Sequence, residues 1–71
     1  PIRETIRLQF DLPYIQEIEY RLFDSVGRLV DEGKILYPDG IQSIPADRLP
    51  SGMNYLHLLG DTKSRTFKVV K

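Results

Sequence analysis

Apolar and polar residues alternate along most of this chain with a period of two. In residues 5–12, for example, Ile6, Leu8, Phe10 and Leu12 alternate with polar neighbours. This period places successive side chains on opposite faces of a β-strand, whereas an amphipathic helix needs a period of about 3.6 residues. No segment keeps a helical apolar stripe over about three turns. The pattern predicts strands at residues 5–12, 17–22, 28–37, 41–46, 53–59 and 65–70.

Turn signals separate the predicted strands. Asp24 and Gly27 suit the first and fourth positions of a type I turn that closes a hairpin, with the glycine free to take a positive φ. Further turns are expected at residues 38–40, 50–52 and 60–64, where proline, glycine and small polar residues gather.

Two local irregularities are also expected. Gly33 interrupts the third strand, where a β-bulge is plausible. Asp47 precedes Arg48 and Leu49 and could cap a single helical turn there.

About six or seven short strands, spaced by about 8–12 residues, predict an all-β fold: a small immunoglobulin-like antiparallel β-sandwich. The chain has 71 residues, which is one domain at most. The apolar positions of the strands and of one turn form the predicted core: Ile6, Leu8, Phe10, Ile18, Tyr20, Leu22, Val30, Ile44, Leu49, Leu56, Leu58, Phe67 and Val69.

Composition excludes several classes of protein. Ten basic and ten acidic residues cancel and are spread along the chain, so the basic stripe of a nucleic-acid-binding protein is missing. The chain has no cysteine, which excludes disulfides and cysteine-based zinc sites. No apolar run approaches the roughly 20 residues of a membrane-spanning helix. We expect no cofactor and no bound metal.

Residues that could carry chemistry have simpler structural explanations. His57 lacks acidic neighbours at metal-ligand spacing, and a chain this short leaves little room for a catalytic triad, so an exposed strand histidine is expected. Glu17 and Glu19 share a strand face with Arg21, which indicates a solvated charged surface. We therefore expect no catalytic residue and no enzyme.

The aromatic residues allow one alternative. Tyr14, Tyr37 and Tyr55 could form a sugar-stacking platform, although aromatics that cover the ends of a small core are commoner. A non-catalytic immunoglobulin-like accessory module that binds a protein or a carbohydrate is therefore the second function considered.

Four motifs stand in a characteristic order. The first predicted strand ends in Leu12-Pro13, residues 22–30 contain an Asp-x-x-Gly-Arg hairpin, residues 44–52 end in Leu-Pro-x-Gly, and the chain ends in Phe-Lys-Val-Val-Lys. In this order the whole chain resembles the C-terminal sorting domain of the type IX (Por) secretion system of Bacteroidota. It departs from the family pattern at Asn54, where a tyrosine is usual, and at Pro45 and Ala46, where aspartate and leucine are usual.

The resemblance implies a function in export. Such domains end cargo proteins that cross the inner membrane by a signal peptide and the outer membrane through the type IX translocon. A surface sortase usually removes the domain, and the cargo becomes secreted or attached to the cell surface. We read Pro1 as the start of a fragment, so residues 1–71 are expected to be the end of a larger protein. The expected partners are translocon and sortase proteins.

The family's recognition information lies mainly in its final segments. Carried onto this chain, those are Leu49, Pro50, Gly52, Phe67, Lys68, Val69, Val70 and Lys71, while Asp24, Gly27 and Arg28 form a structural motif. Each has a second interpretation: Pro and Gly build turns, and lysines guard an edge strand against aggregation. We expect Lys68 and Lys71 to orient a final strand that adds to a receptor's sheet by β-augmentation. Unpaired edges also make an edge-strand dimer possible.

Overall fold

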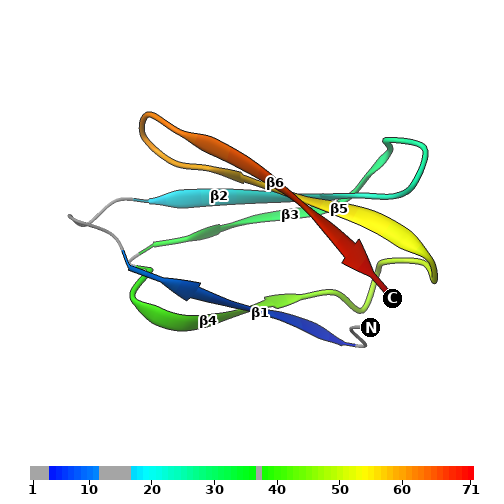
Figure 1. Ribbon diagram of the computed structural model, residues 1–71, viewed down its shortest axis with the longest axis horizontal. Coiled ribbons are helices and arrows are strands. Elements are labelled where there is room, and N and C mark those ends of the chain that lie inside the picture. Colours follow the sequence, from blue (N-terminus) through cyan, green and yellow to red (C-terminus); the bar gives the residue numbers. More distant parts are fainter. Residues whose placement is uncertain (1–3, 12–16, 37) are drawn as a thin grey trace.

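The chain folds into two antiparallel β-sheets packed face to face (Figure 1). The structure is a computed structural model and describes residues 4–11, 17–36 and 38–71. One sheet has two strands, β1 (Thr5–Phe10) and β4 (Gly40–Pro45). The other has four, in the order β3 (Leu29–Ile35), β2 (Ile18–Phe23), β5 (Met53–Leu59) and β6 (Ser64–Val70). The described residues contain no helix, so the predicted small β-sandwich is confirmed.

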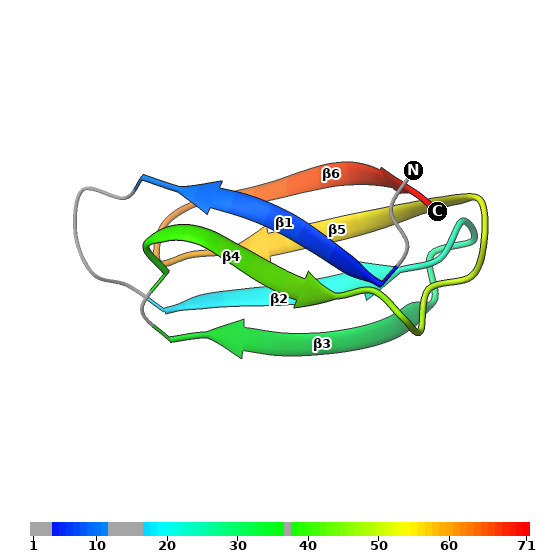
Figure 2. The same ribbon diagram turned by 90° about the horizontal axis from the view of Figure 1, so that it is seen from below.

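The strand order combines local hairpins with one long-range pairing. β2 and β3 form one hairpin and β5 and β6 form another. β1 instead pairs with β4, from Thr5 opposite Pro45 to Phe10 opposite Gly40. In Figure 2 the two layers are seen from below, and β6 lies beyond β1 on the side away from β4.

The core lies between the sheets. Leu22, Ile44 and Leu56 have no exposed surface and pack with other buried residues, namely Ile6, Ala46, Leu49 and Val69. Each fully buried side chain of this size contributes roughly 1.5–3 kcal/mol relative to an exposed one. These contacts stabilise a domain too small to bury more than about 60% of its unfolded surface.

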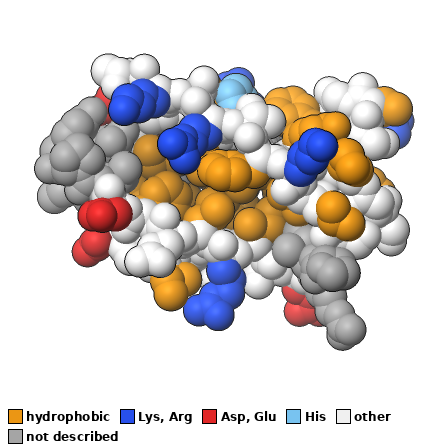
Figure 3. Space-filling model, in the orientation of Figure 1, with side chains coloured by type: hydrophobic (Ala, Val, Ile, Leu, Met, Phe, Trp, Pro, Cys, Tyr) orange, Lys and Arg blue, Asp and Glu red, His pale blue; other side chains and the backbone are white. Residues whose placement is uncertain are grey.

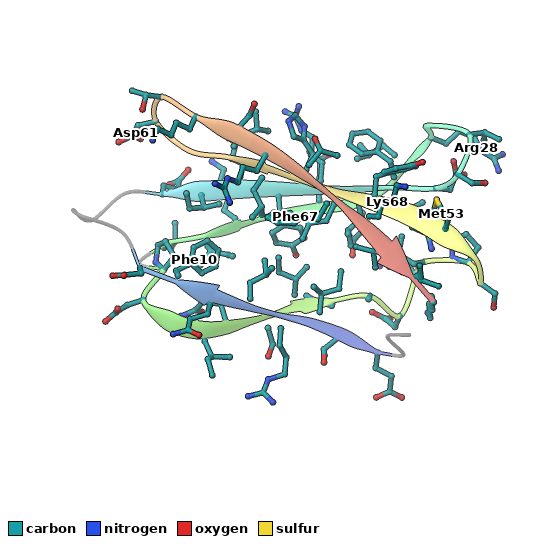
Figure 4. The ribbon with its side chains drawn as sticks, viewed as in Figure 1. Phe10, Arg28, Met53, Asp61, Phe67 and Lys68 are labelled. Carbon is teal, nitrogen blue, oxygen red and sulfur yellow. The ribbon has the colours of Figure 1, made fainter. Side chains whose placement is uncertain are left out.

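Of the thirteen predicted core residues, seven are buried, five are only partly buried (Leu8, Phe10, Tyr20, Val30 and Leu58), and one is exposed. Phe67 is 36% exposed, although it points toward the space between the sheets (Figure 4). Four residues outside the prediction, Asp24, Pro38, Ala46 and Asn54, are also buried. Leu12, also expected in the first strand, lies outside the described residues.

The two expected irregularities differ from the structure. The strand register runs through Gly33 without interruption, and the shift lies between Leu22 and Phe23, which face Asp31 and Leu29. The bulge predicted at Gly33 is therefore wrong. The helical turn predicted for 47–49 is also wrong. Residues 46–49 form an isolated turn instead of a turn of helix, closed by the Leu49 N–H donating to the Ala46 carbonyl at 3.1 Å.

Gly33 serves side-chain packing instead. It lies directly opposite Tyr20 on β2, and a Cβ placed on it would lie 2.5 Å from the Tyr20 hydroxyl oxygen and 2.6 Å from Cζ. The tyrosine ring therefore occupies the space that any side chain at position 33 would need. Burial, with a smaller effect of the Asp31 charge, raises the pKa of Tyr20.

We predict that Gly33→Ala destabilises the domain by about 1–3 kcal/mol, the usual cost of overpacking. Urea denaturation measures the free energy of unfolding. In a Tyr20→Ala background the same glycine substitution should cost much less, because the ring that opposes the new methyl group is gone. An equal cost in both backgrounds would show that strand propensity, and not the ring, requires glycine.

Candidate recognition surface

Lys71 joins two motifs that lie far apart in the sequence. Its ammonium group donates to the backbone carbonyls of Ala46 (2.8 Å), Leu49 (2.9 Å) and Asp47 (3.3 Å). Its backbone pairs with Gly52, through N–H to carbonyl bonds of 2.8 and 2.9 Å in the two directions. Lys71, which follows β6, is thus hydrogen-bonded to the turn that precedes β5.

Asn54 holds the same turn from inside the core. Its side chain is fully buried, and its Nδ2 donates to the Pro50 carbonyl (2.9 Å) and to the Gly52 carbonyl (3.2 Å). Its Oδ1 has no hydrogen-bond partner among the described residues. Gly52 has a φ of +106°, which residues with a Cβ rarely adopt. The departure from the family pattern at Asn54 therefore supplies hydrogen bonds to the Pro50–Gly52 turn.

The predicted recognition residues do not form one surface. Leu49 is buried, while Pro50 and Gly52 are exposed in the turn. Along β6, Phe67 and Val69 face the interior with Val69 buried, and Lys68 and Val70 face outward. Lys68 is exposed and lies opposite Tyr55 on β5. The structure therefore brings the Leu-Pro-x-Gly turn and Lys71 together and separates both from Lys68.

Asp24 organises the β2–β3 hairpin. Its Oδ1 accepts hydrogen bonds from the backbone N–H groups of Val26 (3.0 Å) and Arg28 (2.9 Å), and its Oδ2 pairs with Arg28 Nε at 2.8 Å. The Gly27 N–H donates to the Asp24 carbonyl at 3.1 Å, and Gly27 has a φ of +85°. The predicted turn with a glycine at positive φ is confirmed, and the Arg28 side chain is 80% exposed beyond its bond to Asp24.

The outer face of the four-stranded sheet is polar at its centre. Arg21 lies 3.8 Å from Glu19 and 3.9 Å from Glu32, measured between charged atoms, and Lys34 lies 3.3 Å from Glu17. His57 lies on this face, between Arg21 and Thr66 on the neighbouring strands. The charged surface predicted for Glu17 and Glu19 is present.

Other candidate chemistry finds no support in the described ranges. Within them, no group of three or more His, Cys, Asp or Glu side chains could hold a metal ion. Tyr55 donates a long hydrogen bond to the sulfur of Met53 at 3.7 Å. The carbohydrate platform cannot be assembled from the described structure, because Tyr14 and Tyr37 lie outside it. No helix among the described residues is long and apolar enough to cross a membrane.

An apolar groove brings several of the predicted recognition residues together. It has a volume of about 420 Å³ and lies between β1 and β6. It is lined by Ile6, Leu8, Leu56, Phe67, Lys68, Val69 and Val70. Figure 3 shows hydrophobic side chains at its floor with Lys and Arg side chains on both sides. We call this feature the edge groove.

Sequence reasoning missed the contacts of Lys71 and the edge groove. The alternation that places Phe67 and Val69 inward also places Lys71 on their side of the chain, so its inward direction could have been read from the sequence. The carbonyl partners of Lys71 could not have been read from the sequence, because they depend on the turn that residues 46–49 form.

Comparison with known families gives one result. A family model described as a secretion system C-terminal sorting domain matches residues 1–71. A search of curated proteins and a search of solved structures find no significant match.

We predict that Lys71→Met destabilises the domain by about 1–3 kcal/mol, because three carbonyls lose a charged donor. Lys68→Met is the matched control on the same strand. Lys68 is exposed and makes no hydrogen bond or ion pair with a described residue, so its replacement should change stability by less than about 0.5 kcal/mol. Chemical denaturation compares the two. Equal effects would contradict a structural role for Lys71.

We also predict an acid-dependent contribution from Asp24. The hydrogen bond from the Arg28 N–H, reinforced by its guanidinium and by the Val26 N–H, holds the pKa of this carboxylate below its ordinary value of 3.8. A depressed pKa stabilises the fold above the unfolded-state value, and the contribution is lost as pH falls through the folded-state value. Asp24→Asn should therefore lower the melting temperature at neutral pH, and this difference should shrink below pH 3.8. A difference that stays constant with pH would rule out the carboxylate charge as its source.

Proposed function

The chain belongs to the family of secretion system C-terminal sorting domains of type IX secretion, and from this membership we propose that residues 1–71 act as one export signal at the end of a larger secreted protein. The observation that carries the proposal is the family match over the whole chain. We infer that the cargo reaches the periplasm first, crosses the outer membrane through the type IX translocon, and has the domain removed by a sortase at the cell surface. In this scheme the domain is a substrate of the machinery and not a catalyst.

The geometry supports recognition of the folded domain by the export machinery, in contrast to recognition of separate linear motifs. Lys71 binds the carbonyls of Ala46, Asp47 and Leu49, so the Leu-Pro-x-Gly turn and the end of β6 are one structural unit. We propose that Lys71 acts mainly by holding this unit together and that Lys68, which is exposed, makes direct contact with the machinery. Leu49, Pro50, Gly52, Phe67, Val69 and Val70 keep their predicted part in recognition, and the edge-strand dimer stays a prediction.

The alternative function, an accessory binding module, predicts a different dependence on position and on the translocon. Such a module would work wherever it stands in a protein and would not depend on a translocon. Export is therefore the property that separates the two functions.

We predict that the 71 residues, fused to the C-terminus of a periplasm-directed fluorescent protein, carry it to the surface or the medium of a type IX-competent bacterium. A fusion lacking residues 67–71 should stay in the periplasm, as should the full fusion in a translocon-deficient strain. Lys71→Ala and Lys68→Ala fusions should both be exported less, but only the first should also be less stable when purified. Retention of the full fusion in the competent strain would contradict the proposed function.

A further inference from the structure

The two sheets of the sandwich differ in width, and one strand stays partly uncovered. Leu22, Leu56 and Phe67 are cross-strand neighbours on β2, β5 and β6. Along this row the exposed fraction is 0% at Leu22 and Leu56 and rises to 36% at Phe67. In the described part of the chain the opposite sheet ends at β1, and β6 extends beyond that edge (Figure 2). The edge groove is the space that one more strand beside β1 would fill.

The free edge of β1 offers main-chain groups for such a strand. The Ala46 N–H donates to the Glu4 carbonyl at 2.7 Å, so the backbone groups of Glu4 point toward β4. In an antiparallel pair this direction alternates from residue to residue. The N–H and carbonyl groups of Thr5, Arg7 and Gln9 therefore point away from β4, toward the edge groove.

The rim of the groove is positively charged. Lys68 is one of its lining residues, and Arg65 lies on the same strand face as Phe67. Arg7 lies midway along β1. None of these three cations forms an ion pair with a described residue, and the groove lining contains no acidic side chain.

We propose that the edge groove binds an extended segment of a partner protein in which apolar side chains alternate with acidic ones, and that this segment pairs with the free edge of β1. Its apolar side chains face inward, beside Ile6 and Leu8 and over Phe67, and its acidic side chains face outward, beside Arg7. The main chain supplies affinity and the alternating side chains supply specificity, as in other strand additions.

Pairing at β1 is favoured over pairing at β6 by the apolar area that each would bury. Neighbouring strands lie about 4.8 Å apart and packed sheets about 10 Å apart. A strand added to β6 would extend the wider sheet further beyond its cover. A strand added to β1 instead comes to lie over Phe67 and removes its exposed surface from water.

This inference rests on the proposed function, since the partner that we expect to supply the segment belongs to the export machinery. It can nevertheless be tested on the isolated chain. The probe is a peptide of about seven residues, the length of a short strand, that alternates valine with glutamate. Two control peptides are used, one with lysine in place of glutamate and one with the same residues in blocks.

Binding is followed by amide NMR shifts and hydrogen exchange of the isolated chain. The alternating acidic peptide should protect the amides of Thr5, Arg7 and Gln9, and each control should bind at least about tenfold more weakly. Arg7→Glu should reverse the preference between the acidic and the basic peptide. No protection of these three amides by the acidic peptide, or equal binding of the basic one, would overturn the proposal.

A proline pair tests the edge itself. Gln9→Pro removes an N–H from the free edge of β1 without breaking a bond to β4, whereas Ser43→Pro makes the same change on the free edge of β4. Gln9→Pro should abolish peptide protection and reduce export of the fluorescent fusion, and Ser43→Pro should do neither. Melting temperatures check that both variants fold. If Gln9→Pro does not fold, the Arg7→Glu variant is used to test the proposal instead.

The outcomes separate the two proposals. If the unchanged fusion is not exported, the proposed function fails whatever the peptide does. If it is exported and folded Gln9→Pro is exported equally well, the groove inference fails and the proposed function stands.

Discussion

The structure depends on the contact between a two-stranded sheet and a four-stranded sheet. Strands at about 4.8 Å spacing give the narrow sheet roughly half the width of the wide one. Where the two overlap, Leu22, Ile44 and Leu56 are completely buried, and most of the stabilisation must come from there. Where they do not overlap, an inward-facing residue such as Phe67 keeps surface in contact with water. The width of the small sheet thus decides both which residues stabilise the fold and which stay available to a partner.

One end of the sandwich is closed by polar contacts. The turn at 46–49 directs three carbonyls toward the end of β6, and an apolar side chain there would remove the charged donor that all three share. A lysine satisfies them and keeps its charge near water, while Asn54 binds the next turn from the core side. Motifs that look like separate linear signals in the sequence are therefore parts of one folded end. Loss of recognition after a change in either motif can accordingly have a structural cause.

The sequence allowed all six strands to be placed within a few residues, because alternation shows directly which side chains share a face. The Asp24–Gly27 turn was predictable for a similar reason, since its hydrogen bonds are local. Alternation does not show how far the opposite sheet extends, and this is why Phe67 was expected in the core and the edge groove was missed. A bulge was expected at Gly33 because the sequence does not show why a glycine is needed there. The reason is the ring of Tyr20, which belongs to another strand. The contacts of Lys71 likewise depend on a turn 22–25 residues away in sequence.

The free edges of the two sheets are protected in different ways. Pro45 lies on the free edge of β4 and lacks the N–H that an added strand would need, so it blocks pairing with any partner at that point. β1 and β6 carry cations instead, Arg7 and Lys68. Unlike a proline, a cation on an edge strand discriminates between partner strands by their charge. Antiparallel pairing of β1 with β1 of a second copy, centred on Arg7, places like charges directly opposite each other, which is destabilising. An acidic segment meets the same residue as an opposite charge. The charge that protects β1 against a second copy of this chain therefore also selects the acidic partner that the edge groove fits.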